Sequence, residues 1–219
     1  MVVTFLTAKQ THDFIDHDQD RFISNLSPTD LVARGVRSRY SYRIQCSQSA
    51  DDFTYEEKAA LARNAQRADA LLKKLVCVPG LNPHVICQMP WNFAKCSTDY
   101  EGGLPHTRAD IIFTKCGELT VDQCAHEKIH VYQRMYPEAA RVYLTTRGFA
   151  KIAPNPMRRA NPDQDNNSYT RKGKVYDGIY TSSNPSSISS VRPTQHPYEL
   201  MAYEAVRKLL PSRTEFYRK

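Results

Sequence analysis

Leucine and alanine recur at helical spacing along residues 54–75, which read TYEEKAALARNAQRADALLKKL. The apolar positions lie three or four residues apart, as they do on one face of an amphipathic helix. Thr54 followed by Glu57 forms a capping box, which predicts that the helix begins there. The apolar stripe of this helix is expected to face the core rather than to form a binding site.

A second helix is predicted over about residues 121–135. Thr120 and Gln123 form another capping box, apolar residues follow, and Pro137 marks the end. A third, shorter helix is predicted to open at Ser27-Pro28, because serine suits the N-cap and proline the first helical position.

Strand patterns are shorter. Residues 40–44 (YSYRI) alternate between apolar and polar side chains, and residues 76–78 and 84–87 predict short strands or loop around a Pro-Gly turn. Residues 108–114 (RADIIFT) predict a strand directly before the helix at 121–135. Residues 148–195 have few apolar side chains and predict a long irregular connection, which would serve as a flap over a cleft. Together these patterns predict an α+β fold, mainly helical with a small antiparallel or mixed sheet.

Composition limits the class of protein. The chain has 219 residues, of which 41% are hydrophobic, and no stretch is long and apolar enough for a membrane span. The first residues lack the basic lead of a signal peptide, so we read them as mature protein. Six cysteines without a C-x-x-C pair argue against a zinc ribbon and predict free thiols in a reducing, intracellular compartment.

The positive charge is concentrated in one segment. The net charge is +7, and residues 139–195 hold nine Lys or Arg against three Asp. Such a segment would attract nucleic acid or an acidic polypeptide. No RNA-recognition, zinc-finger or helix-turn-helix pattern accompanies it, so a solvated charged loop is the alternative interpretation.

The sequence His126-Glu127-Lys128-Ile129-His130 carries the clearest chemistry. On a helix of about 3.6 residues per turn, His126 and His130 lie on one face and reach a single tetrahedral zinc ion. Glu127 falls beside that ion, where a carboxylate suits the general-base role in a zinc hydrolase. The alternative is a helix with two partly buried histidines that are paired with neighbouring groups.

A catalytic zinc ion needs a third protein ligand. Glu199 is the best candidate, because Pro197 opens a helix and places Glu199 in its first turn. Glu204 on another face of that helix is the second choice. For either residue, the plain alternative is a negative charge that complements the helix dipole.

The two segments HEKIHVYQR and HPYELMAYE resemble the two metal-binding helices of compact gluzincin-type metallopeptidases. GGLPHTRADIIF and RRANPDQDNNSY also resemble segments of uncharacterised zincin-like proteins of large DNA viruses. The resemblance covers about residues 88–209. It implies a zincin-like fold with an active-site cleft and Zn2+ on His126, His130 and Glu199, with Glu127 as the base. A viral protein would act in the host cytoplasm or the virion.

The resemblance suggests a division of the chain and further site residues. Residues 1–80, without such a match, are expected to form a helical region of unknown role, and residues 81–219 the metallopeptidase core, as two parts or as one continuous domain. Gluzincin-like enzymes stabilise the reaction's oxyanion with a Tyr or His, for which the sequence leaves several candidates open: Tyr169, Tyr176, Tyr180, His196 and Tyr203. His106 is a further cleft candidate. Four residues are expected on an exposed edge strand that pairs with an extended peptide: Asp110, Ile111, Ile112 and Phe113.

The sequence supports two candidate functions. The first is a zinc metallopeptidase that hydrolyses peptide bonds of a polypeptide with a zinc-activated water and Glu127 as general base. The alternative is a catalytically silent binding or structural protein of the same fold, which engages nucleic acid or a protein partner through residues 139–195.

Overall fold

The computed structural model describes residues 2–115, 119–192 and 194–210. The helices of these residues are α1 (Ala8–His17), α2 (Pro28–Ala33), α3 (Arg39–Gln48), α4 (Tyr55–Leu72), α5 (Pro83–Gln88), α6 (Val121–Met135), α7 (Pro137–Thr146), α8 (Pro197–Leu209) and the 3₁₀ turn η1 (Glu101–Gly103). The strands are β1 (Val3–Phe5), β2 (Ala50–Asp51), β3 (Trp91–Cys96), β4 (His106–Arg108), β5 (Ile111–Thr114), β6 (Ala150–Ile152), β7 (Ser168–Arg171) and β8 (Lys174–Tyr176). The fold is therefore α+β, as the sequence predicts.

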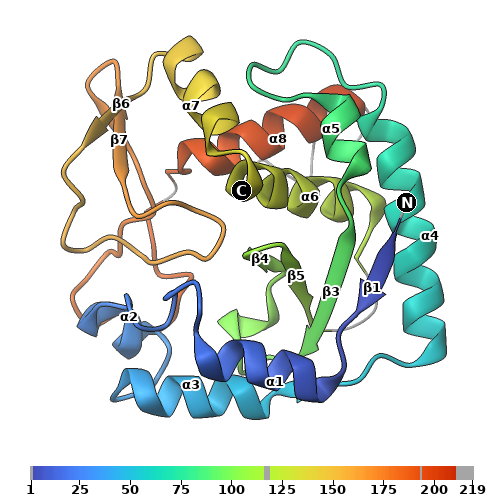
Figure 1. Cartoon of the computed structure of the whole chain (residues 1–219). Coiled ribbons are helices and arrows are strands. Elements are labelled where there is room, and N and C mark those ends of the chain that lie inside the picture. Colours follow the sequence, from blue (N-terminus) through green and yellow to red (C-terminus); the bar gives the residue numbers. More distant parts are fainter. Residues whose placement is uncertain (1, 116–118, 193, 211–219) are drawn as a thin grey trace.

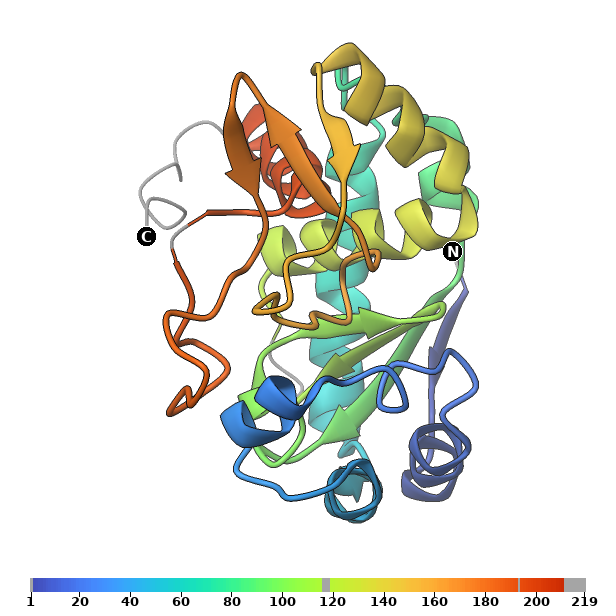
Figure 2. The same ribbon diagram turned by 90° about the vertical axis from the view of Figure 1, so that its left-hand side faces the viewer.

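A small mixed sheet forms the centre of the molecule (Figure 1). Its strands run in the order β1-β3-β5-β4, and β2 pairs with the far end of β3. Strands β1, β3 and β5 are parallel, whereas β4 runs antiparallel to β5. Figures 1 and 2 show α1 and α3 on one side of this sheet and α6 and α8 on the other.

Both faces of the sheet are buried, because alternate residues of a strand point to opposite faces. In β5, Ile112 joins the core that contains α4, α6 and α8, whereas Ile111 and Phe113 join the core under α1 and α3. In β3, Phe93 joins the first of these cores and Ala94 joins the second. A strand covered on both faces reads as an unbroken apolar run, which is the pattern of residues 111–113.

The predicted helix starts are confirmed. The side chains of Thr54 and Thr120 accept hydrogen bonds from the third backbone N–H of α4 and α6, and the reciprocal half of each capping box is also present. Ser27 caps α2 in the same way, with Pro28 as the first residue of that helix. Helix α6 spans residues 121–135, as predicted, and α7 follows it at Pro137.

Two strand predictions are wrong. Residues 40–44 lie in α3, where Ser38 caps the helix and Tyr42 and Cys46, one turn apart, are buried. The short alternating pattern of residues 40–44 therefore did not decide between strand and helix, and tertiary packing selected the helix. Residues 84–87 lie in α5, which Asn82 caps with its side chain. Residues 76–78 form no strand.

The segment predicted as irregular, residues 148–195, contains a second sheet. Strands β6, β7 and β8 form an antiparallel sheet in that order, beside α7 and α8 in Figure 2. Lys172 and Gly173 join β7 to β8 with φ angles of 51° and 73°. Such a tight turn requires positive φ at both positions, which glycine adopts without strain.

Residues from both sides of position 80 build the same core. Strand β1 pairs with β3, and α4 packs against α6. Helix α2 also holds a distant loop, because Asp30 accepts a hydrogen bond from the Ala160 N–H at 2.9 Å and Arg34 donates one to the Ala160 carbonyl at 3.1 Å. In the described part of the chain, no helix is long and apolar enough to cross a membrane.

Candidate metal centre

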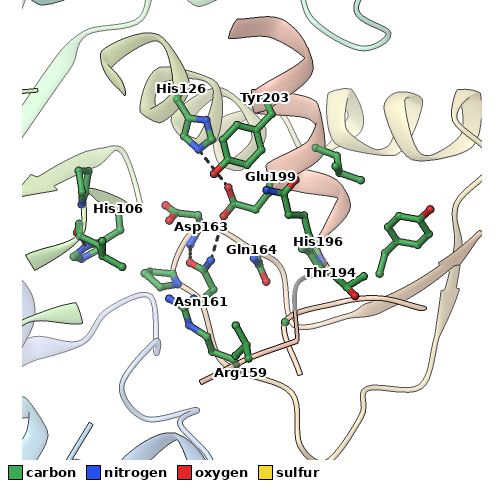
Figure 3. Close-up of a pocket in the computed structure, with 18 of the residues that line it drawn as sticks. His106, His126, Arg159, Asn161, Asp163, Gln164, Thr194, His196, Glu199 and Tyr203 are labelled. Atoms are coloured by element: carbon green, nitrogen blue, oxygen red, sulfur yellow. Dashed lines mark hydrogen bonds and ion pairs between the residues drawn. The ribbon is translucent and has the colours of Figure 1, made fainter. Parts of the chain in front are cut away.

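Two histidines of α6, His126 and His130, meet Glu199 of α8. His126 and Glu199 also line a pocket (Figure 3). The Nε2 atoms of His126 and His130 lie 3.0 Å apart. The Oε2 atom of Glu199 lies 3.3 Å from the first of these nitrogens and 3.5 Å from the second. Two imidazoles and one carboxylate that converge in this way could hold a metal ion, and donors of these types are common in zinc sites.

The start of α8 explains the position of Glu199. Pro197 occupies the first turn, and the imidazole of His196 caps the helix by accepting a hydrogen bond from the Tyr198 N–H at 3.3 Å. The other ring nitrogen of His196 lies 3.2 Å from the Asn167 carbonyl oxygen. Because both ring nitrogens are engaged and the residue is fully buried, His196 supports the helix. This contact pattern does not suit the role of oxyanion donor that the sequence left open for it.

Gln133 links His130 to α8. Its Oε1 lies 2.8 Å from Nδ1 of His130, and its Nε2 donates to the Tyr198 carbonyl at 3.0 Å. Since an amide oxygen only accepts, Nδ1 of His130 carries a proton, and Nε2 is the ring nitrogen that faces His126 and Glu199. This arrangement fits a metal ligand. The Nδ1 atom of His126 is buried without a hydrogen-bond partner.

Glu127 lies beside the ligands and is only 4% exposed. One carboxylate oxygen accepts a hydrogen bond from the Thr107 hydroxyl at 3.0 Å. Burial raises the pKa of Glu127 well above its usual range, and the carboxylates of Asp163 and Glu199 raise it further. A raised pKa makes the carboxylate a stronger base than a solvated one, which suits a general base.

The electrostatics of the ligands are tightly linked. Burial by itself would lower the pKa of His130, but the nearby carboxylates of Glu199 and Asp163 outweigh it and raise that pKa to about 10. Burial would raise the pKa of Glu199, whereas His130 holds it well below its usual range. The glutamate is therefore ionised, as a metal ligand must be.

Two residues of the loop before β7 complete the site, and the sequence reasoning missed both. Asn161 donates from Nδ2 to Oε1 of Glu199 at 3.2 Å, which leaves Oε2 directed at the histidines. The Asn161 side-chain oxygen accepts from the backbone N–H of Asp163 at 3.0 Å. The available signal was the dense Asn and Asp content of NPDQDNN, residues 161–167. The sequence alone does not show that this loop folds back onto α8.

The predicted edge strand is wrong. Residues 108–114 form two strands rather than one, because Ala109, with φ of 50°, and Asp110 make a tight turn between β4 and β5. Asp110 is held in this turn by the side chain of Asn92 at 2.9 Å. Ile111, Ile112 and Phe113 belong to β5, which pairs with β3 on one side and β4 on the other and therefore has no free edge.

Strand β4 is the outermost strand, and the loop covers part of its edge. The backbone N–H of Thr107 donates to the carboxylate of Asp163 at 2.6 Å. His106, Thr107 and Arg108 are all buried, at 3%, 0% and 0% exposure. An extended peptide would have to displace Asp163 before it could pair with Thr107.

The remaining candidates fall into two groups. Tyr203 lines the pocket, with its ring centroid 4.7 Å from that of His126 (Figure 3), and Tyr176 also lines it. Tyr180 is outside the lining and donates to Asp30 at 3.0 Å, and Tyr169 donates to Asp165 at 2.6 Å. The structure thus reduces the tyrosine candidates to Tyr203 and Tyr176.

Glu204 is engaged on a different face of α8. Its carboxylate forms an ion pair with Arg147 and accepts a hydrogen bond from the Tyr143 hydroxyl at 3.2 Å. Of the two glutamates considered as third ligand, Glu199 is the one that meets the histidines.

The pocket in front of the ligands has a volume of about 760 Å³. Its walls come from β4, α6, α8 and the segment between β6 and α8. His106 also lines the pocket, where its ring stacks on Phe113 with centroids 5.1 Å apart. Its Nδ1 is hydrogen-bonded to the Leu104 carbonyl at 2.9 Å, and its Nε2 is buried without a partner.

Comparison with known proteins finds no match for this chain. The chain matches no protein-family model, no curated protein and no solved structure.

Proposed function

We propose that this protein is a zincin-like zinc metallopeptidase that hydrolyses peptide bonds in a polypeptide substrate. The observation that carries the proposal is the convergence of His126, His130 and Glu199 beside the buried carboxylate of Glu127, at the end of an open pocket. Zinc held there would supply the Lewis acid that polarises the substrate carbonyl and lowers the pKa of a water molecule.

The chain's own residues divide the remaining work. Glu127 takes the proton from the attacking water and passes it to the leaving amine nitrogen, a role that suits its raised pKa. Thr107 orients Glu127 through its hydroxyl, and Gln133 and Asn161 orient the ligands His130 and Glu199. Tyr203, beside His126 in the pocket wall, is placed to donate to the developing oxyanion.

The metal content tests the ligand set. We expect the purified chain to hold about one zinc ion, measured by elemental mass spectrometry after mild chelation, and Glu199→Ala to lose it, because a two-ligand site binds zinc weakly. Glu204→Ala is the matched control on the same helix and should retain zinc. If the parent protein holds no zinc after reconstitution, the proposed function is wrong.

The catalytic role of Glu127 needs a separate test. Glu127→Gln should keep zinc, fold normally and cleave peptides about 10² to 10⁴-fold more slowly than the parent, because an amide cannot accept the proton. Glu138→Gln, on the exposed surface of α7, is the control. Equal rates for parent and Glu127→Gln would exclude Glu127 as the general base.

A further inference from the structure

Three basic side chains line the pocket wall formed by the segment between β6 and α8. They are Arg159, Lys174 and Arg192. Figure 3 shows Arg159 across the pocket from His126 and Tyr203, with Asn161 and Asp163 between them. The pocket therefore has an acidic end at the metal ligands and a basic end opposite.

The two backbone positions that carry the arginines are held together. The Arg159 N–H donates to the Gly178 carbonyl at 2.7 Å, and the Arg192 N–H donates to the Ile179 carbonyl at 2.8 Å. Gly178 and Ile179 are consecutive residues of one strand-like segment. Arg159 and Arg192, which bond to them, therefore belong to the same wall of the pocket. Tyr180, the next residue, anchors this wall to α2 through Asp30.

Among the residues that the structure describes, Arg159 forms no ion pair, although its charge reaches Glu101 and helps to lower the pKa of that carboxyl. Its Nε is buried without a hydrogen-bond acceptor. The neighbouring Arg158 also has a buried Nε without a hydrogen-bond acceptor, but that atom forms an ion pair with Asp177 at 3.2 Å. Glu101 also lines the pocket, but its carboxylate already accepts two hydrogen bonds from Arg34 at 2.8 Å. A partly buried guanidinium without an acceptor favours an anionic ligand.

We infer that the basic wall binds a carboxylate of the polypeptide substrate, with Arg159 as the main contact and Lys174 and Arg192 at its rim. This inference rests on the proposed function, which it deepens by naming the substrate class. A planar guanidinium pairs with a carboxylate through two parallel hydrogen bonds. The basic side chains lie at the end of the pocket away from the candidate metal ligands, so a carboxylate bound there would also set the direction in which a peptide lies. The carboxylate belongs either to an Asp or Glu side chain or to the C-terminus of the peptide.

The experiment compares four sets of short synthetic peptides with the zinc-loaded full chain. The sets contain Glu or Gln at a fixed position and carry a free or an amidated C-terminus. Cleavage is followed by mass spectrometry, and binding of fluorescently labelled peptides to the Glu127→Gln protein is followed by anisotropy. Variants Arg159→Gln and Arg159→Lys are compared with Lys151→Gln, which removes an exposed charge of β6 outside the pocket lining.

We expect about tenfold preference for one carboxylate source, the size of one charge-assisted hydrogen-bonded pair. Preference for Glu over Gln identifies a side-chain carboxylate, and preference for free over amidated peptides identifies the C-terminus. Arg159→Gln should abolish the preference while neutral peptides are still cleaved, Arg159→Lys should retain part of it, and Lys151→Gln all of it.

Two failures are distinguishable. Cleavage of all four sets at equal rates and equal binding would overturn the inference and leave the proposed function standing. If zinc-loaded protein cleaves nothing, the proposed function fails, and the anisotropy data then decide the inference alone. Carboxylate-dependent binding that Arg159→Gln abolishes would support it, and binding without that dependence would overturn it.

Discussion

At the residue scale, Gln133 connects the two helices that carry the candidate ligands. It accepts from the Nδ1–H of His130 and donates to the Tyr198 carbonyl, one residue before Glu199. A single amide thus selects the histidine tautomer and holds the start of α8. The side chain is 2% exposed, so water does not readily replace it.

Gln133→Leu should therefore weaken zinc binding by about 10- to 100-fold without removal of any ligand. Competition with a chromophoric zinc chelator measures the affinity. Gln66→Leu, on the exposed side of α4, is the matched control. Unchanged affinity in Gln133→Leu would mean that the ligands are held by packing alone.

Tyr180 illustrates how a candidate catalytic residue becomes a structural one. Its hydroxyl donates to Asp30 of α2, and Tyr180 is not among the residues that line the pocket. Tyr180→Phe should lower the free energy of unfolding by about 1 kcal/mol, the net value of one buried hydrogen bond. Zinc content and the kcat of peptide cleavage should stay within about twofold of the parent. Urea unfolding measures the change in stability, and steady-state kinetics measure the change in kcat. A large loss of kcat with zinc retained would show that Tyr180 has a role in catalysis.

At the element scale, the loop before β7 and the outermost strand β4 depend on each other. Asp163 takes the hydrogen bond of the Thr107 N–H, and Asn161 of the same loop contacts Glu199. The loop therefore covers the strand edge and orients a candidate ligand at the same time.

Asp163→Ala should leave the Thr107 N–H without a protein acceptor and destabilise the fold by about 1–3 kcal/mol. Hydrogen exchange at the Thr107 amide should become faster. Asp163→Asn, which keeps an acceptor oxygen, should lose less protection. Equal protection of this amide in all three proteins would show that the loop does not close the edge in solution.

At the scale of the whole molecule, two buried groups couple folding to pH. Burial would raise the pKa of Glu101, but the Arg34 guanidinium outweighs it and lowers that pKa to about 2. Burial also lowers the pKa of His106 from its ordinary 6.5 to about 4. In both cases the unfolded chain binds the proton more readily, so stability falls as the pH falls.

The histidine contribution is complete above pH 6.5 and is lost between pH 6.5 and about 4. The glutamate contribution is complete above its ordinary pKa of 4.5 and is lost from there down to about pH 2.

His106→Asn should therefore flatten the pH dependence of the unfolding free energy between pH 6.5 and 4, by up to about 3 kcal/mol. Urea unfolding in the presence of a chelator measures this difference, and His84→Asn, an exposed histidine, is the control. Parallel curves for His106→Asn and the parent would contradict the assignment.

Much of the site could be predicted because its signals are local. The spacing of His126 and His130 and the capping box at Thr120 act within a few turns of one helix. Pro197 likewise defines the start of α8 and the place of Glu199. The sequence did not predict the helix at residues 40–44, where the short pattern suited either period and packing against the sheet decided.

The sequence by itself determined the helices that carry the candidate ligands, the chemistry of those ligands and the α+β class, because helix caps, apolar period and side-chain type are properties of neighbouring residues. Only the tertiary structure decided which strand is outermost, that Asp163 and Asn161 reach the site, and that Arg159 faces the pocket while Arg158 is paired. These features depend on contacts between residues far apart in the chain. Local propensity carries no information about such contacts, since they form only when the elements pack.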